Sequence, residues 1–170
     1  MSAARIRPAE PGDAAAMVDL VNSCFEEYRE FAPASWEPPG GEGAVERVEV
    51  GLSRGGSGGA VAEADGAHAG HAMWIPALAA PHYDTDDPGT AYLSQLFLSR
   101  EHRGTGLASQ LLGWAVDRAR RLGYREMRLL TPAGQARARA FYAREGWSEL
   151  GDWGVHPELR LPLVECGRRL

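Results

Sequence analysis

Apolar residues recur along the chain with two different spacings, and each spacing predicts one kind of element. A return every three or four positions predicts amphipathic helices over 13 to 31–33, 44–52, 107–122 and 134–144. Short apolar runs between turn residues predict strands over 6–8, 60–64, 68–75, 91–98, 126–131, 147–153 and 159–166. This alternation predicts one α/β (α+β) domain over residues 3–166, with helices flanking a mixed sheet.

Turn and cap residues mark the ends of several of these elements. Pro8 is expected to end the first strand, and Asp13 is expected to be the N-cap of the first helix. Asp65-Gly66 predicts the tight turn of a hairpin between 60–64 and 68–75. The glycine-rich tract 55–59 resembles a flexible linker, but it is too short to separate domains, so we expect it to join a helix to a strand.

The stretch 96–108 is the most informative part of the sequence. An apolar run is followed by Gly104 and Gly106, and an amphipathic helix begins immediately afterwards. Glycines let the backbone approach a ligand, and the N–H groups of a helix start favour anions, so this order predicts a phosphate or pyrophosphate site. A simple strand-to-helix turn stays open as an alternative. The ATP-type loop needs a lysine, and the chain contains none. The dinucleotide fingerprint needs a third glycine or alanine at the position of Ser109, so neither common nucleotide loop applies.

Two segments resemble motifs of the Gcn5-related N-acetyltransferase (GNAT) family. Arg103-Gly104-Thr105-Gly106-Leu107-Ala108 is similar to its Q/R-x-x-G-x-G/A pattern, which holds the pyrophosphate of acetyl-coenzyme A. The segment 135–147 resembles the later N-x-x-A-x-x-F-Y-x-x-x-G-F/W motif, although Gln135 stands where Asn is usual. The resemblance implies a mostly antiparallel sheet of six to seven strands, acetyl-CoA as cofactor, and acetyl transfer to a primary amine by direct attack.

The resemblance also assigns candidate site residues. The backbone of the strand would pair with the pantetheine arm and the loop amides would hold the pyrophosphate, which together give the cofactor set Leu96, Phe97, Leu98, Arg103, Gly104, Thr105, Gly106, Leu107, Ala108, Ser109, Gln135, Ala138 and Tyr142. Tyr142 matches the family's tyrosine near the sulfur, where its hydroxyl can donate a proton to the leaving thiolate. A core aromatic is the alternative reading of Tyr142.

In the same family, the first helix and the loop after it line the acceptor side. Substrate contacts are therefore expected from Phe25, Glu26, Tyr28, Glu30 and Trp36, and from Tyr83 and Asp84 in the loop 76–89. Family members often place a glutamate base on the central strand, but the corresponding segment here, Tyr92-Leu93-Ser94-Gln95, has no carboxylate. A water chain ending on Asp84, His82 or Glu26 is an open alternative.

Charge is unevenly distributed along the chain. Residues 100–144 hold ten Arg against three acidic residues, a balance of +7, whereas residues 1–99 hold five Arg against 15 acidic residues, a balance of −10. The basic part favours an anionic cofactor, and the acidic part, including Asp84, Asp86 and Asp87, favours a small cationic acceptor. The net charge of −5 disfavours a nucleic-acid partner.

The cysteines, histidines and apolar runs of the sequence narrow the class of protein further. Two cysteines far apart in sequence predict buried reduced thiols, and the histidine spacing predicts no metal site. No apolar run predicts a membrane span or a secretory signal, and we expect a cytoplasmic protein. Protein N-terminal or lysine acetylation, a non-catalytic acyl-CoA-binding module and a nucleotide-phosphate binder stay open, as does the oligomeric state, including a homodimer.

Overall fold

The elements follow the chain in the order that the apolar spacing predicts, and the computed structural model describes residues 4–170. The strands of this part of the chain are β1 (Arg5–Pro8), β2 (Gly58–Ala64), β3 (Ala67–Pro76), β4 (Thr90–Leu98), β5 (Glu126–Pro132), β6 (Ser148–Val155) and β7 (Pro162–Arg169). The α-helices are α1 (Ala14–Glu26), α2 (Ala44–Ser53), α3 (Leu107–Arg121) and α4 (Ala136–Arg144). Four short 3₁₀ turns lie at Pro11–Asp13, Glu27–Glu30, Ala77–Ala79 and Arg100–His102.

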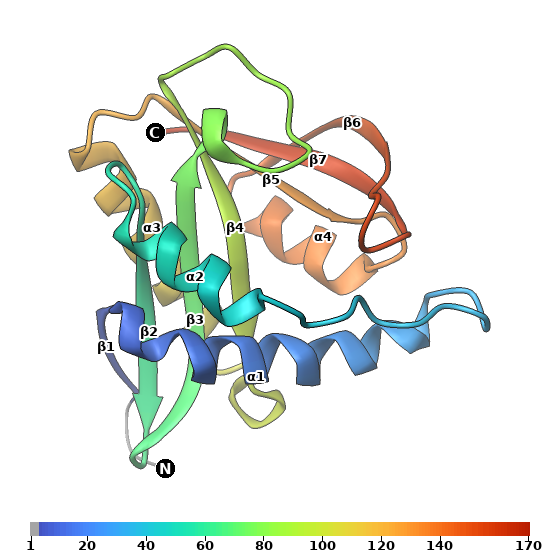
Figure 1. Ribbon diagram of the computed structural model, residues 1–170. Coiled ribbons are helices and arrows are strands. Elements are labelled where there is room, and N and C mark those ends of the chain that lie inside the picture. Colours follow the sequence, from blue (N-terminus) through green and yellow to red (C-terminus); the bar gives the residue numbers. More distant parts are fainter. Residues whose placement is uncertain (1–3) are drawn as a thin grey trace.

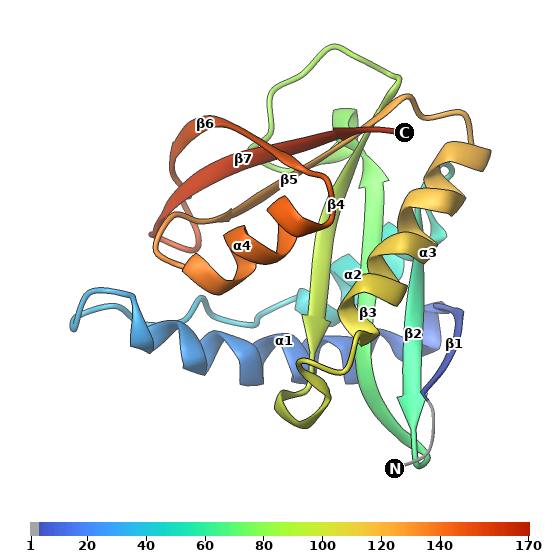
Figure 2. The same cartoon turned by 180° about the vertical axis from the view of Figure 1, so that it is seen from behind.

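The strands form one open sheet in the order β1-β2-β3-β4-β5-β7-β6. All neighbouring strands are antiparallel except β4 and β5. The parallel pairing covers three residue pairs, from Thr90↔Glu126 to Tyr92↔Arg128, and the two strands then diverge (Figures 1 and 2). The expected mixed, mostly antiparallel sheet is confirmed, and it opens into a wedge beside β4.

Helices cover both faces of this sheet, so each strand of its centre is buried on two sides. Helices α1 and α2 lie on one face of β2–β4, whereas α3 lies on the other (Figures 1 and 2). On β3, Met73 and Ile75 pack toward α1 and α2, while Ala72 and Trp74 pack toward α3. A strand buried on both faces is mostly apolar, which explains the apolar run over residues 72–75 of β3.

The glycine-rich tract joins α2 to β2, as expected, and its last two residues are already part of the strand. Gly58 and Gly59 begin β2, two residues before the predicted start, and the tract is ordered by close packing. A Cβ on Gly58 would lie 2.4 Å from the Trp74 ring, and one on Gly59 would lie 2.9 Å from the carbonyl oxygen of Ala72. These glycines therefore allow close contact between β2 and β3, while Asp65 and Gly66 form the predicted turn with positive φ values of 50° and 79°.

Several element boundaries differ from the sequence-based expectation. The first helix, expected to reach 31–33, is α-helical only to Glu26 and continues as a 3₁₀ turn over Glu27–Glu30. Two further differences have identifiable reasons. Asp13 is not a side-chain N-cap of α1, because its carboxylate is engaged with Arg7 and with the backbone N–H of Glu10. The last strand is β7, three residues later than predicted. Leu159 and Leu161 instead anchor the β6–β7 loop: Trp36 donates its indole N–H to the Leu159 carbonyl at 2.7 Å, and Leu161 is buried beside Trp36.

Candidate functional site

The edge of β4 that faces the wedge is the first component of the site. Because the pairing with β5 ends at Tyr92, no other strand of residues 4–170 pairs with this edge of β4 beyond that point. Residues 94–97 are half-buried rather than buried, unlike the centre of the sheet. An unpaired strand edge offers N–H and C=O groups to an extended ligand, so this edge can hold a linear polar chain as an added strand.

The loop between β4 and α3 is the second component. Gly104 and Gly106 have φ values of 73° and 86°, in the left-handed region that favours glycine. No heavy atom lies within 4 Å of where a Cβ would stand at either position. Gly106 is the N-cap residue of α3, so the first-turn N–H groups and the positive end of the helix dipole lie beside an open backbone. This arrangement suits a phosphate or pyrophosphate.

The side chain of Arg103 points away from this loop toward the end of α1. Its guanidinium forms an ion pair with Glu27, in which Nη2 lies 3.0 Å from Oε1 and a second, closer contact joins Nη1 to Oε2. Hydrogen bonding to Arg103 holds the pKa of the Glu27 carboxyl below its ordinary value. The loop therefore offers backbone amides rather than the Arg103 side chain to an anion.

Helix α4 closes the α3 side of the wedge and carries Tyr142. The Tyr142 ring packs 5.3 Å from Phe141 and 5.8 Å from Trp147, measured between ring centroids. Burial raises the pKa of its hydroxyl far above the ordinary value, with smaller contributions from the nearby Tyr28, Cys166 and Tyr92. The hydroxyl is therefore a proton donor at neutral pH.

Three further candidates of the cofactor set lie on α3, on α4 or directly before α4. Ser109 donates a hydrogen bond to Glu145 Oε1 at 2.6 Å, and this contact links the start of α3 to the end of α4. Gln135 precedes α4 without a side-chain cap bond, and its backbone N–H bonds the Pro132 carbonyl at 3.0 Å. Ala138 is half-buried on the same helix. The structure thus gathers both sequence motifs around the wedge.

Two of the expected acceptor-side residues pack against β4, and two others are buried in a small core. Phe25 contacts β4 edge-to-face at 6.0 Å from the Phe97 ring, and the Tyr83 ring lies 5.2 Å from that of Tyr92. Tyr28 and Trp36, only 7% and 5% exposed, form a small core with Phe31 and Leu161. These two support the loop after α1, and a substrate contact through them stays a prediction.

Some of the acidic candidate residues already have hydrogen-bond or ion-pair partners within the protein. The Asp87 carboxylate holds the turn before β4: it accepts bonds from the Gly89 N–H at 2.8 Å, the Thr90 hydroxyl at 2.7 Å and Arg125 at 3.0 Å. Glu26 is paired with Arg29 at 2.9 Å. Asp84, Asp86 and Glu30 are exposed and make no ion pair within the described residues.

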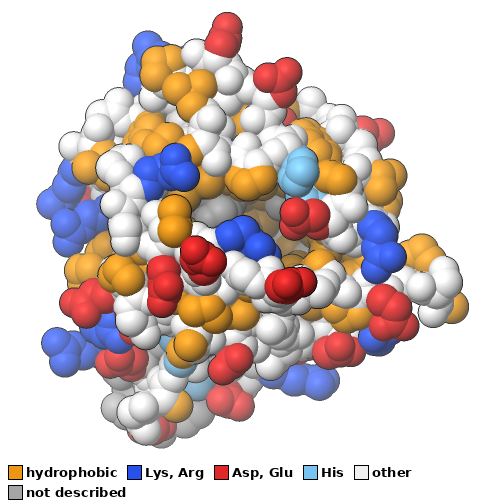
Figure 3. Space-filling model, viewed as in Figure 1, with side chains coloured by type: hydrophobic (Ala, Val, Ile, Leu, Met, Phe, Trp, Pro, Cys, Tyr) orange, Lys and Arg blue, Asp and Glu red, His pale blue; other side chains and the backbone are white. Residues whose placement is uncertain are grey.

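The α1–α2 loop, the start of α2 and the β6–β7 loop enclose a pocket that the sequence did not indicate. Its volume is about 370 Å³, and it is lined by Pro39, Gly40, Glu42, Arg47, Pro157, Glu158 and Arg160. Figure 3 shows this face of the molecule hollowed near its centre, with acidic and basic side chains at the rim. Two acidic and two basic residues balance, so the lining itself has no net charge.

A second feature missed at the sequence level is a buried polar chain from β3 to β4. His71 is fully buried and bonded to both His68 and Gln95. On a regular strand His68 and His71 would point to opposite faces, but a bulge at Ala69 brings them to the same side. No sequence signal marks that bulge.

A metal-binding cluster and a membrane-spanning helix are both absent from the described part of the chain. Residues 4–170 contain no group of three or more His, Cys, Asp or Glu side chains placed to hold a metal ion. Among the same residues, no helix has the length and apolar character needed to cross a bilayer. Cys24 and Cys166 are both buried free thiols, as expected.

Comparisons with known proteins agree with this geometry. Residues 17–147 match the family model described as the acetyltransferase (GNAT) family. An N-acetyltransferase from Staphylococcus aureus Mu50 has the same fold with a TM-score of 0.76, at 22% identity over 99% of each chain. A ribosomal-protein-alanine N-acetyltransferase from Brucella melitensis gives 0.74 at 23% identity, over 98% of this chain and 99% of that one.

A third solved structure contains a ligand. It is a GNAT superfamily phosphinothricin acetyltransferase from Sinorhizobium meliloti in complex with AcCoA, with a TM-score of 0.76 at 22% identity, over 99% of this chain and 89% of that one. No curated protein sequence matches this chain significantly.

Proposed function

Because this chain belongs to the acetyltransferase (GNAT) family, we propose that it transfers the acetyl group of acetyl-CoA to a primary amine. In this proposal the amine attacks directly within a ternary complex, without an acyl-enzyme. The acceptor is a small molecule whose amine arrives as a cation. The proposed location is the cytoplasm, a reducing compartment that suits two free buried thiols.

The observation that carries this proposal is the open edge of β4 next to the glycine loop. The residues present fit acetyl-CoA, because the edge beyond Tyr92 is free of a strand partner and the loop backbone at Gly104 and Gly106 is uncovered. Leu96 and Leu98 would hold the pantetheine arm, and the amides of 103–109 would hold the pyrophosphate. When bound, acetyl-CoA supplies an acyl group activated as a thioester.

The chain's own residues then supply orientation and proton transfer. A backbone N–H of β4 near the Ser94 bulge is proposed as the donor that stabilises negative charge on the acyl oxygen. Tyr142 keeps its proton at Oη because burial raises its pKa, and that proton is available to the leaving thiolate. Phe25 and Tyr83 contact β4 from the other side and are proposed to face the acceptor.

The proton of the acceptor amine needs a separate route. The segment 92–95 has no carboxylate, so we propose a water chain that ends on Asp84, His82 or Glu26. Nε2 of His82 lies 3.5 Å from Oε1 of Glu158, where the loop 76–89 meets the β6–β7 loop. Asp84 is exposed on the same loop and has no ion-pair partner within residues 4–170.

The deciding experiment combines purified protein, acetyl-CoA and a panel of amines, with free thiol and product mass as readouts. The panel contains a polyamine, neutral and anionic amines, and peptides with a free N-terminus or an internal lysine. We expect acetylated small amines, whereas acetylation of the peptides alone would transfer the proposal to protein acetylation. Coenzyme A binding with no acetylated product from any amine would show a non-catalytic acyl-CoA-binding module instead.

A further inference from the structure

The buried chain from β3 to β4 ends at the candidate site and has no role in the function proposed so far. His71 is 0% exposed, and its two ring nitrogens have one partner each. Nδ1 lies 2.9 Å from Nε2 of His68, and Nε2 lies 2.9 Å from Oε1 of Gln95. A fully buried imidazole with both nitrogens bonded is held rigidly, because releasing either bond would leave a buried polar atom unpaired.

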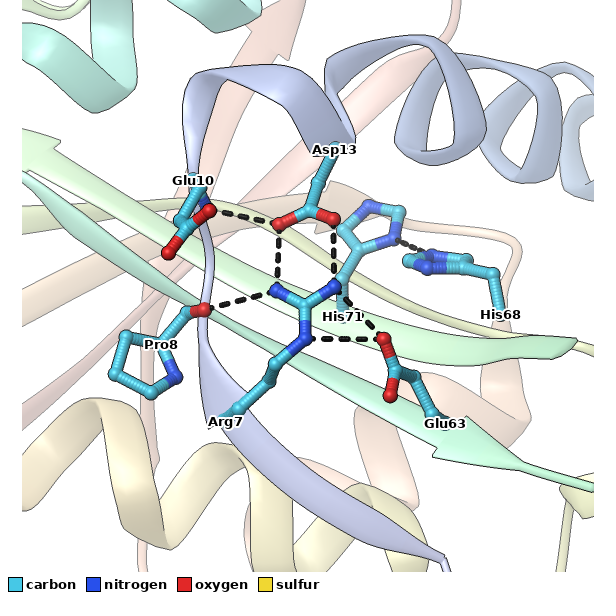
Figure 4. Close-up of polar contacts among 7 residues, drawn as sticks. All are labelled: Arg7, Pro8, Glu10, Asp13, Glu63, His68 and His71. Carbon is cyan, nitrogen blue, oxygen red and sulfur yellow. Dashed lines mark hydrogen bonds and ion pairs between the residues drawn. The ribbon is translucent and has the colours of Figure 1, made fainter. Parts of the chain in front are cut away.

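The outer end of this chain lies beside an ion-pair cluster at the start of α1. Figure 4 shows Arg7 between Asp13 and Glu63, with His68 and His71 beside them. Arg7 donates to both Asp13 oxygens at 2.8 and 2.7 Å and to Glu63 at 2.9 Å. Burial lowers the pKa of His68 and His71, so both rings are neutral at neutral pH.

Neutral rings fix the direction of the hydrogen bonds. The oxygen of Gln95 can only accept, so Nε2 of His71 must carry the proton and its Nδ1 must be the acceptor. His68 then donates from Nε2. The remaining group of Gln95, its NH₂, has no hydrogen-bond partner within residues 4–170.

Gln95 stands at a distinctive place on β4. It follows the bulged Ser94 and pairs with Met73, so it shares the α1 side of the strand with Tyr92 and Phe97. It is half-buried, in the part of β4 that β5 no longer covers. The free NH₂ group is therefore held on the side where Phe25 and Tyr83 contact the same strand.

We infer that Gln95 determines acceptor specificity by donating a hydrogen bond to an oxygen of the acceptor, and that His71 is the positioning residue that orients it. The preferred acceptor class is a primary amine with a carbonyl, hydroxyl or carboxylate oxygen a few bonds from the nitrogen. This inference rests on the proposed acetyltransferase function.

The first test needs no activity. Nitrogen-15 NMR of the wild-type protein should show His71 as the neutral tautomer protonated at Nε2, with Nδ1 as an acceptor. Protonation at Nδ1 instead would mean that the Gln95 amide is turned with its oxygen outward, and this would overturn the inference.

The second test compares kcat/KM for glycinamide and propylamine, which differ mainly in the oxygen-bearing group. Gln95→Glu keeps an oxygen for His71 and removes the outward N–H donor, so the glycinamide-to-propylamine ratio should fall about threefold to tenfold, the scale of one hydrogen bond. Comparing the ratio between variant and wild type cancels the different basicity of the two amines. An assay pH at which both amines are cations also cancels the general attraction of the added charge. Asn22→Asp, the same change at an exposed position of α1, is the control and should leave the ratio unchanged.

His71 is tested through its coupling to Gln95. His71→Ala should lower the same ratio, mostly through KM for glycinamide, and should have no further effect on it in the Gln95→Glu background. Independent, additive effects on the ratio, or a ratio that Gln95→Glu leaves unchanged, would overturn the inference while the acetyltransferase function stands. If no amine is acetylated, the proposed function fails and this inference falls with it. If His71→Ala does not fold, the NMR measurement of the His71 tautomer still tests the orientation of the Gln95 amide.

Discussion

Burial leaves Tyr142 and His71 uncharged for the same physical reason, although their pKa values move in opposite directions. Desolvation disfavours the charged form, so it raises the pKa of the Tyr142 hydroxyl and lowers that of the His71 imidazole to about 3. Tyr142 therefore keeps a proton to donate, while His71 has no proton to gain at neutral pH. These two residues give the clearest single-residue predictions.

Replacing Tyr142 by Phe removes the proton donor and keeps the ring that packs beside Trp147. Turnover should fall by roughly 10²-fold or more, the scale of general acid catalysis, while CoA affinity stays within about threefold. Steady-state kinetics together with calorimetric CoA titration measure both quantities. Unchanged turnover in a folded Tyr142→Phe variant would make Tyr142 a packing residue only.

The lowered pKa of His71 predicts an acid-sensitive fold. Between pH 6.5 and about 3 the unfolded chain binds a proton at this ring that the folded chain does not, so stability should fall as pH decreases, by up to about 1.36 kcal/mol per pH unit. Above pH 6.5 the ring is neutral in both states and contributes no pH dependence. The nearest other groups are His68 on β3 and, beyond it, the paired Arg7, Asp13 and Glu63.

Urea unfolding at several pH values measures this slope. His71→Gln should flatten it, whereas His82→Asn, at an exposed loop residue with a positive φ of 62°, should leave it as in the wild type. An equal slope in the wild type and in His71→Gln would contradict the assignment.

At the scale of elements, Gly106 meets two requirements of the loop before α3: a positive φ and an uncovered backbone. Gly106→Val forces a β-branched residue toward a φ of 86° and places methyl groups beside the uncovered backbone. CoA binding should weaken more than tenfold, equivalent to about 1.4 kcal/mol, as measured by calorimetry. Gly113→Ala is the matched control within α3, because its added Cβ meets no atom within 4 Å and its φ is not positive. Unchanged affinity in a folded Gly106→Val variant would remove the loop from the binding site.

The sequence predicts elements well where a periodic pattern is itself the cause of burial. The α3 helix and the strand over 91–98 are placed within a residue or so, because their apolar faces form the core. The sequence-based predictions are wrong at Gly58, Asp13 and Leu159, because the conformations of these residues depend on partners outside their own elements: the Trp74 ring, the Arg7 guanidinium and the Trp36 indole. The polar chain through His71 depends on the bulge at Ala69, which no local pattern encodes.

At the scale of the whole molecule, the acidic and basic parts of the sequence partly neutralise each other. Glu27 pairs with Arg103 and Asp87 with Arg125, so each of these pairs joins the two parts. The charges left for an incoming cation are therefore fewer than the sequence balance suggests, and Asp84 and Asp86 are the exposed acids of the loop 76–89 without an ion pair in the described chain.

Neutralising those two charges should affect acceptors selectively. The double variant Asp84→Asn with Asp86→Asn should raise KM for a cationic acceptor and have less effect on a neutral amine. In the wild type, added salt should lower kcat/KM for the cation, because salt screens exposed charges over about 8 Å. Asp65→Asn in the β2–β3 turn removes one negative charge outside this loop; it is the control and should change neither KM. Equal losses for both acceptors, or none, would leave the loop without a role in selection.

The short parallel pairing between β4 and β5 has a mechanical consequence. Along the sheet, three residue pairs join the half built from β1–β4 to the half built from β5–β7. A seam of three residue pairs has fewer ladder hydrogen bonds than a full-length pairing, so we expect it to resist bending between the two halves less. A ligand that lies along the free edge of β4 and contacts α4 would bridge both halves. Its binding would therefore make the whole sheet more rigid.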